Sequence, residues 1–123
     1  MNQPGRRILI ADDNRDWTDG LALLLKDQGY AVRTAYDGQE AINAAREFQP
    51  HVVILDVSMP RMTGYEAGRV LSQQPAGARP VLIAITAWPR DSGRLQAEML
   101  AGFDHYVGKS RDATEILELV RRV

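Results

Sequence analysis

The stretch RRILIADDN, residues 6–14, decides the fold prediction because a short apolar run leads directly into two adjacent carboxylates. The run Ile8–Ala11 is continuous rather than alternating, which is typical of a parallel strand covered on both faces. Two like charges about 4 Å apart repel by roughly 4 kcal/mol at an effective dielectric constant near 20. Asp12 and Asp13, which end the run, therefore need either full hydration or a counter-charge.

The composition sets the limits of the prediction. A chain of 123 residues can bury roughly two-thirds of its unfolded surface, so we expect one domain over residues 1–123. The absence of cysteine excludes disulfides, thiol chemistry and thiolate metal sites. The net charge of −1 suggests binding neither to nucleic acid nor to a membrane. Because the chain lacks a membrane-length apolar run and a signal-peptide core, we expect a soluble cytoplasmic domain.

Strand-like and helix-like segments alternate five times along the chain. Short apolar runs predict strands at Ile8–Ala11, Ala31–Ala35, Val52–Leu55, Val81–Ile85 and Tyr106–Val107. Helical spacing and boundary signals predict helices around Trp17–Leu25, Asp37–Phe48, Tyr65–Ser72, Arg90–Leu100 and Asp112–Val123. This order predicts an α/β fold, a doubly wound five-stranded parallel sheet with helices on both faces (flavodoxin-like).

Several residues indicate where the helices begin and end. Gly29 is a stop signal for the first helix, and Asp37 with Glu40 forms a predicted capping box at the start of the second. Asp112 with Glu115 forms the same pattern before the last helix. The apolar stripe of the first helix comprises Trp17, Leu21, Leu24 and Leu25, and we expect Trp17 to pack that helix against the sheet.

Polar residues follow four of the five predicted strands. Asp12 and Asp13 follow the first, Asp56 the third, Thr86 the fourth and Lys109 the fifth. In such sheets, ligands bind beyond the carboxyl ends of the strands. Three crowded carboxylates favour a hard divalent cation, and Mg²⁺ prefers few carboxylates together with waters and a phosphate. We expect a bound metal to offset the repulsion between the acids.

Five stretches match one known family in order and spacing: Ile10–Asn14, Asp37–Gly38, Val53–Gly64, Ile85–Ala87 and Gly102–Lys109. Together they resemble the receiver domains of two-component response regulators, and the resemblance covers essentially the whole chain. The segments Gly64–Glu66 and Gly102–Asp104 are similar to the corresponding segments of receivers attached to hybrid histidine kinases.

The resemblance implies a phosphoryl-transfer site. Asp56 would be the nucleophile that takes a phosphoryl group from a phosphohistidine of a histidine kinase or histidine phosphotransfer domain, forming an aspartyl phosphate. Asp13 would hold Mg²⁺ directly, and Asp12 would act mainly through water. Asp56 and the backbone carbonyl of Ser58 would complete the protein ligands, and Lys109 would pair with the phosphoryl oxygens.

The resemblance also implies a switch. Thr86 would hydrogen-bond the new phosphoryl group, and its movement would let Tyr106 turn inward. This would alter the face formed by the fourth helix, fifth strand and fifth helix, which a downstream protein would read. The domain would take part in its own phosphorylation and dephosphorylation without turning over a separate substrate, so it would not be an enzyme in the usual sense.

Other interpretations stay open at this point. Asp12 and Asp13 can serve simply as helix caps, and Tyr106 can be an ordinary half-buried strand aromatic. The domain can also be a receiver-like interaction module that signals without phosphorylation. Flavin-binding and haloacid-dehalogenase-type enzymes fit poorly, because the two acids would repel a phosphate and Ser58 stands where the second acid of such a phosphatase is needed.

The chain departs from the family pattern at two positions. Thr63 occupies a place often held by Asp or Asn, and Ser110 replaces the proline that usually follows the lysine. A cis bond that does not precede proline costs about 2.5–4 kcal/mol. We therefore predict a trans bond between Lys109 and Ser110.

Overall fold

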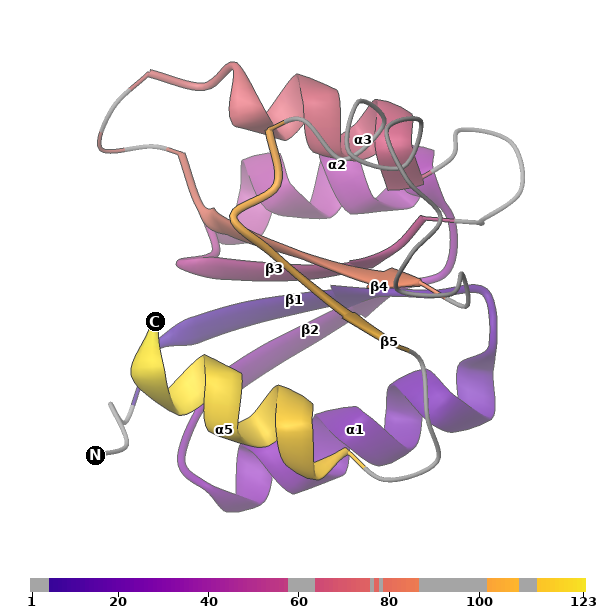
Figure 1. Cartoon of the computed structure of the whole chain (residues 1–123), viewed down its shortest axis with the longest axis vertical. Coiled ribbons are helices and arrows are strands. Elements are labelled where there is room, and N and C mark those ends of the chain that lie inside the picture. Colours follow the sequence, from indigo (N-terminus) through magenta and orange to yellow (C-terminus); the bar gives the residue numbers. More distant parts are fainter. Residues whose placement is uncertain (1–4, 58–63, 76, 78, 87–101, 109–112) are drawn as a thin grey trace.

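The predicted alternation of strands and helices is present in the computed structural model (Figure 1). The structure describes residues 5–57, 64–75, 77, 79–86, 102–108 and 113–123. The strands are β1 (Arg7–Ala11), β2 (Ala31–Ala35), β3 (Val52–Asp56), β4 (Val81–Thr86) and β5 (His105–Gly108). The helices are α1 (Arg15–Asp27), α2 (Gly38–Phe48), α3 (Gly64–Ser72) and α5 (Thr114–Arg122).

Some of the predictions fall outside the described residues. The helix predicted over Arg90–Leu100 lies there. So do several single positions: Ser58, Thr63, Lys109, Ser110 and Asp112.

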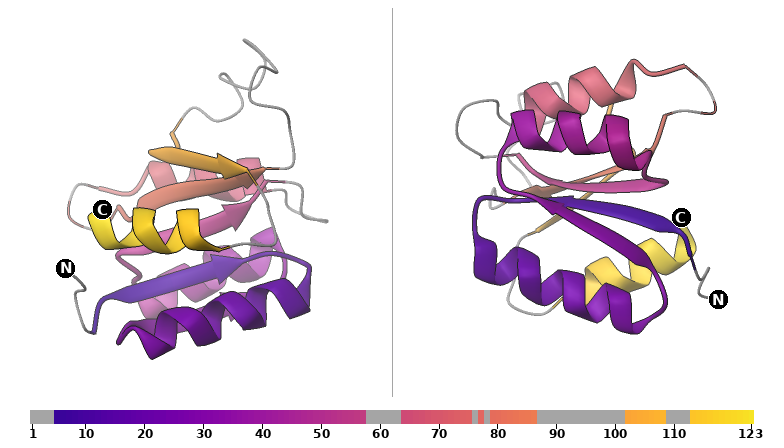
Figure 2. Two further views of the ribbon diagram at one scale, coloured as in Figure 1. Left: turned by 60° about the horizontal axis from the view of Figure 1, so that its bottom comes forward. Right: turned by 180° about the vertical axis from the view of Figure 1, so that it is seen from behind.

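All five strands pair in parallel in the order β2-β1-β3-β4-β5. Helices α2 and α3 cover one face of the sheet, while α1 and α5 cover the other (Figures 1 and 2). The doubly wound parallel sheet predicted from the sequence is therefore confirmed. No helix in the described part of the chain is both long enough and apolar enough to cross a membrane.

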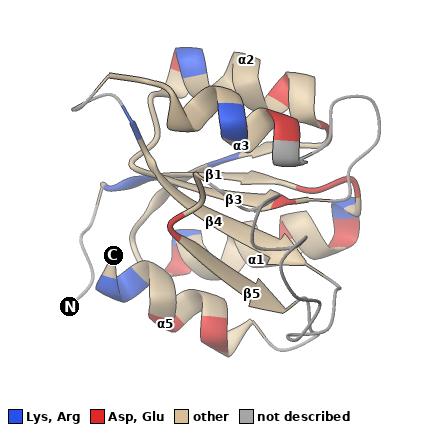
Figure 3. Ribbon diagram, turned by 45° about the horizontal axis from the view of Figure 1, so that its top comes forward, with Lys and Arg blue, Asp and Glu red and all other residues tan. Residues whose placement is uncertain are grey.

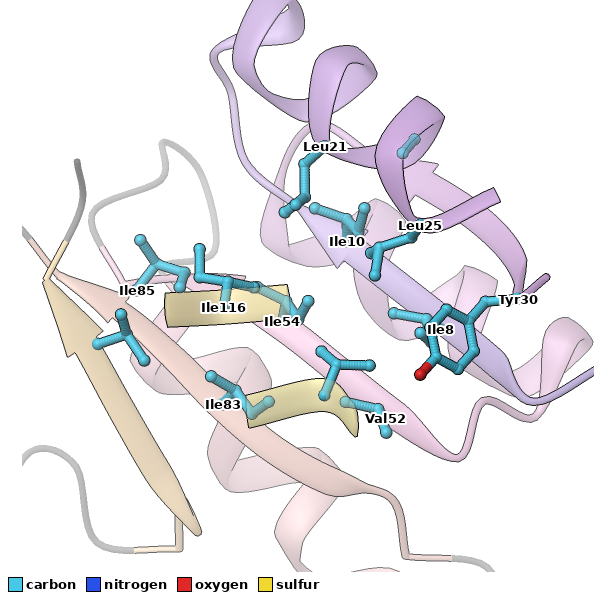
Figure 4. Packing of buried hydrophobic residues seen from close by; sticks show 13 residues of the cluster. Ile8, Ile10, Leu21, Leu25, Tyr30, Val52, Ile54, Ile83, Ile85 and Ile116 are labelled. Carbon is cyan, nitrogen blue, oxygen red and sulfur yellow. The ribbon is translucent and has the colours of Figure 1, made fainter. Parts of the chain in front are cut away.

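Burial on both faces explains the continuous apolar runs. In β1, Ile8 and Ile10 point into a cluster with Leu25 of α1 and Val120 of α5, part of which Figure 4 shows. The intervening residues, such as Leu9, pack in a second cluster with residues of α2 and α3. Because successive strand side chains alternate between faces, a strand with helices on both sides has no polar face.

Helix α1 is placed by its buried stripe and its two ends. Thr18, Leu21, Ala22 and Leu25 are buried, and Trp17 packs against the same cluster as predicted. Leu24 is 47% exposed, so its inclusion in the core stripe was wrong. Successive helical residues are about 100° apart, which places Leu24 off a stripe centred on residues 18, 21, 22 and 25.

The helix boundaries confirm two predicted signals and correct a third. Gly29 has a φ of +97° just after the end of α1, where glycine is favoured. Asp37 caps α2 by accepting a hydrogen bond from the backbone N–H of Glu40 at 2.8 Å. The N-cap of α5 is Ala113 rather than Asp112, and its methyl side chain cannot accept a capping hydrogen bond.

The chain entering β5 packs tightly against α3. Phe103 is partly buried against the core cluster that includes Leu71 of α3 and against the small cluster of Val57 and Ala84. A Cβ added to Gly68 of α3 would lie only 2.3 Å from the Cζ atom of Phe103. Gly68 is thus the position at which helix α3 makes room for the aromatic ring.

We expect Gly68→Ala to lower the free energy of unfolding by up to about 2 kcal/mol. Overpacking of a core costs roughly 1–3 kcal/mol, which exceeds the gain of about 1 kcal/mol in helix propensity. The control is Gly20→Ala in α1, where an added Cβ meets nothing within 4 Å, so the propensity gain should appear as higher stability. Urea denaturation measures both variants. Equal stabilisation of the two would show that Phe103 moves aside without cost.

Candidate functional site

The carboxyl ends of β1 and β3 bring three acidic residues together. Ala11, the last residue of β1, pairs with Leu55 of β3, so the residues that follow, Asp12 and Asp56, leave the sheet side by side. Asp56 ends β3 and is 7% exposed, whereas Asp12 is fully buried. Asp13, the next residue, is exposed. Acidic residues at these strand ends are visible in Figure 3.

The acids of the first strand do not act as the cap of α1. The N-cap is Asn14, whose side chain accepts a hydrogen bond from the Trp17 N–H at 3.1 Å. Asp12 stabilises the turn that leads into α1, because its Oδ1 accepts a hydrogen bond from the Asn14 N–H at 2.9 Å. The capping interpretation of Asp12 and Asp13 is therefore wrong. The capping role of Asn14 was not predicted from the sequence, although an asparagine directly before a helical stripe is a capping signal.

Asp12, Asp13 and Asp56 can together hold a metal ion. One carboxylate oxygen from each lies within 4.8 Å of those of the other two. At an effective dielectric constant near 20, two charges about 5 Å apart repel by roughly 3 kcal/mol, and two of these carboxylates are buried. Hard oxygen donors in this number suit Mg²⁺, so the donor set fits the predicted ion.

Thr86 lies on the neighbouring strand at the same edge of the sheet. It ends β4, is 2% exposed and pairs with Gly108 of β5. Its neighbour Ile85 pairs with Asp56, which places the hydroxyl-bearing residue one step beyond the acid along the next strand. The parallel register thus brings Thr86 to the edge predicted from the sequence.

Of the remaining predicted residues, the structure describes Tyr106 but not Lys109 or Ser58. Tyr106 lies on β5 with 56% of its surface exposed, so it is neither turned inward nor half-buried. Lys109 follows the last described residue of β5, and both it and Ser58 lie outside the described residues. Their roles stay predictions.

Comparison with known proteins gives a consistent result. A family model described as "Response regulator receiver domain" matches residues 8–121. The chain is 35% identical over 94% of its length to an uncharacterized protein from Leptolyngbya boryana, of which it covers 87%. It is 37% identical over 94% of its length to the response regulator MprA of Mycolicibacterium vanbaalenii. It spans about half the length of the MprA relatives, 48% in that case.

Solved structures show the same architecture. The response regulator TrrA from Thermotoga maritima, in complex with Mg²⁺ and BeF, has a TM-score of 0.83 and 28% identity, with 95% of this chain and 97% of that chain covered. The receiver domain of the sensor histidine kinase PA1611 from Pseudomonas aeruginosa has Mg²⁺ coordinated in its active-site cleft. It has a TM-score of 0.82 and 28% identity, with 96% of each chain covered.

Millimolar Mg²⁺ should raise the melting temperature, and Asp13→Asn should reduce this rise. A ligand that binds only the folded state stabilises it by about 2.7 kcal/mol at a hundred times its Kd. The control is Asp27→Asn at the far end of α1, which removes the same charge outside the cluster. Thermal unfolding with and without Mg²⁺ measures the effect. The same response in all three proteins would argue against a metal site at Asp13.

Proposed function

Because this chain belongs to the family of response regulator receiver domains, we propose that it accepts a phosphoryl group on Asp56 and works as one domain of a two-component phosphorelay. The observation that carries the proposal is the convergence of Asp12, Asp13 and Asp56, since one carboxylate oxygen from each lies within 4.8 Å of those of the other two. Like charges held this close together destabilise the folded state. A phosphoryl-transfer reaction that depends on a bound cation accounts for their presence.

The reaction needs only positioning and charge neutralisation from the protein. A carboxylate oxygen of Asp56 attacks the phosphorus of a phosphohistidine, and the new O–P bond forms as the N–P bond breaks. The electron pair of that bond leaves with the imidazole nitrogen of the donor. Asp13, Asp56 and the backbone carbonyl of Ser58 would hold Mg²⁺, and the bound ion would supply positive charge to neutralise the transferring group.

The other residues of the site hold the product. Thr86, at the end of the neighbouring strand, donates a hydrogen bond to a phosphoryl oxygen, and Lys109 pairs with another. Asp12, which is buried, would act on the metal mainly through water. Since the group stays on the protein until hydrolysis, we assign no separate substrate turnover to the domain.

The phosphoryl donor is a histidine kinase or a histidine phosphotransfer domain. The similar receiver of PA1611 belongs to a sensor histidine kinase, and both it and TrrA hold Mg²⁺. These likenesses support an Mg²⁺-dependent relay with a phosphohistidine donor.

The switch acts through Thr86 and Tyr106. Two charge-assisted hydrogen bonds, from Thr86 and Lys109, supply about 3–6 kcal/mol. Moving a two-state equilibrium from 1:99 to 99:1 takes about 5.5 kcal/mol, so we expect a graded shift. Tyr106, now 56% exposed on β5, would turn inward and change the surface that a partner reads.

The second candidate function is an interaction module that signals without phosphorylation. The exposed aromatic ring of Tyr106 favours it, since such a ring is available for a partner without any switch. The labelling experiment below separates the two functions.

Asp56 should gain one phosphoryl group when the protein is incubated with Mg²⁺ and a small phosphodonor or a phosphorylated histidine domain. The product should be stable in acid and labile in base, as expected for an acyl phosphate, and mass spectrometry should detect it. Asp56→Asn should abolish the label, whereas Asp27→Asn should retain it. Labelling that persists in Asp56→Asn would remove Asp56 as the acceptor. An unlabelled parent protein would favour the interaction module.

Amide exchange between Thr86 and Tyr106 should change on phosphorylation of the parent protein and change much less in Thr86→Ala. The physical reason is that the alanine lacks the hydroxyl that holds the phosphoryl oxygen. Thr86→Ser, which keeps the hydroxyl, is the matched control and should respond like the parent. If the alanine and serine variants respond alike, Thr86 has no part in the switch.

A further inference from the structure

Thr18 is a buried polar residue that the proposed phosphoryl transfer does not use. It lies in the first turn of α1 and is 0% exposed. A buried hydroxyl destabilises the folded state unless it forms a hydrogen bond, whereas a valine of nearly the same shape would fill the position without that requirement. The contribution of this residue therefore depends on what its hydroxyl contacts.

The Thr18 hydroxyl lies between two backbone carbonyls of the turn that joins β1 to α1. Its Oγ1 is 2.8 Å from the carbonyl oxygen of Asn14 and 3.3 Å from that of Asp12. A hydroxyl donates a single proton, so Asn14 receives the stronger hydrogen bond and Asp12 the weaker one. Because Asp12 and Asn14 are the chain neighbours of Asp13, the hydroxyl holds the backbone on both sides of Asp13.

The contact with Asp12 differs from an ordinary interaction within a helix. A helical threonine often donates to the carbonyl four residues earlier, and the hydrogen bond to Asn14 has this spacing. Asp12 lies six residues before Thr18, between the end of β1 and the start of α1. The chain turns directly from β1 into α1 there (Figure 2). The hydroxyl thus connects the helix to the strand end that carries the acids.

Two further hydrogen bonds fix the same turn. The Asp12 N–H donates to the Ala35 carbonyl of β2 at 3.1 Å, and the Asp12 carboxylate accepts from the Asn14 N–H at 2.9 Å. Thr18 adds the contact from α1, whose buried stripe packs against the sheet. The turn is therefore held by strand β2 on one side and by helix α1 on the other.

The side chain of Asp13 depends on this support more than the other two acids do. Asp12 and Asp56 are buried, whereas Asp13 is exposed. The described residues give the Asp13 carboxylate no hydrogen bond or ion pair. One of its oxygens nevertheless lies within 4.8 Å of an oxygen of each of the other two acids. The backbone of the turn therefore limits where this carboxylate can lie.

We propose that Thr18 is a positioning residue for the metal site, because its hydroxyl holds the turn that keeps the Asp13 carboxylate beside Asp56. The inference rests on the proposed function, since it gives Thr18 a part in the same Mg²⁺ site. Thr18 acts through the backbone of the turn and contributes no ligand atom of its own. Substitution of residues that orient metal ligands typically weakens metal binding about 10–100-fold.

Magnesium binding by Thr18→Val tests the proposal, because valine keeps the shape of threonine and lacks the hydroxyl. Titration with Mg²⁺, followed by the amide NMR signals at a temperature at which every variant is folded, measures the Kd separately from stability. We expect about tenfold weaker binding in Thr18→Val. Thr18→Ser, which keeps the hydroxyl, should bind like the parent. The matched control is Thr34→Val on β2, which makes the same change outside the turn and should also bind like the parent.

A second measurement needs no metal. The amides at positions 14 and 18 donate to the Asp12 carboxylate and the Asn14 carbonyl. Without Mg²⁺, their hydrogen exchange should be at least about threefold faster in Thr18→Val than in the parent and Thr18→Ser, as expected for the loss of one hydrogen bond. If Thr18→Val does not fold, Thr18→Ala replaces it in both measurements, because alanine also lacks the hydroxyl.

Three outcomes would overturn the proposal while leaving the metal site intact. They are an unchanged Mg²⁺ affinity in Thr18→Val, equal weakening in Thr18→Val and Thr18→Ser, and equal weakening in Thr18→Val and Thr34→Val. A parent protein that binds no Mg²⁺ at millimolar concentration would overturn the metal site itself and this inference with it. Phosphoryl labelling of Asp56 in the parent tests the proposed function separately, so the two failures can be told apart.

Discussion

The pairing register between β1 and β3 is the constraint on which the acidic site depends. Ala11 lies opposite Leu55, so Asp12 and Asp56 emerge at the same level of the sheet. A slip of one residue would turn the side chains of a strand to the opposite face. Because both faces of these strands are buried, such a slip would also disrupt both core clusters. The packing that holds the fold therefore also keeps three like charges close together.

The segment that precedes β5 is held against the sheet by a separate set of contacts. The carboxylate of Asp104 accepts hydrogen bonds from the Leu82 N–H at 2.8 Å and from Arg79. The neighbouring Phe103 packs into the space left by Gly68. These contacts hold the beginning of β5, while Tyr106 further along the strand stays exposed. In the proposed switch, a movement at Thr86 would reorient Tyr106 on a strand whose entry is held in place.

The two ends of the sheet have opposite chemistry. Three carboxylates meet at the carboxyl ends of the strands, and four arginines line a pocket at the amino ends. The same strands run between them, since Arg7 begins β1 and Asp12 follows its end. A strand of five residues spans roughly 17 Å, so the attraction between the two ends is largely screened by solvent and salt.

The sequence by itself determined the number of the described strands and their succession along the chain, the burial of β1, β3 and β4 on both faces, and the residue types at the carboxyl ends of the strands. These properties are local, because continuous apolar runs and glycine or capping signals act within a few residues. Only the tertiary structure decided that Asn14 rather than Asp12 caps α1, that Leu24 is exposed, and that Asp12 is buried while Asp13 is not. The tertiary structure also forms the arginine-lined pocket, whose lining residues come from segments more than 70 residues apart. Such features depend on strand order, register and helix rotation, which arise from packing between distant segments and leave no periodic pattern in the chain.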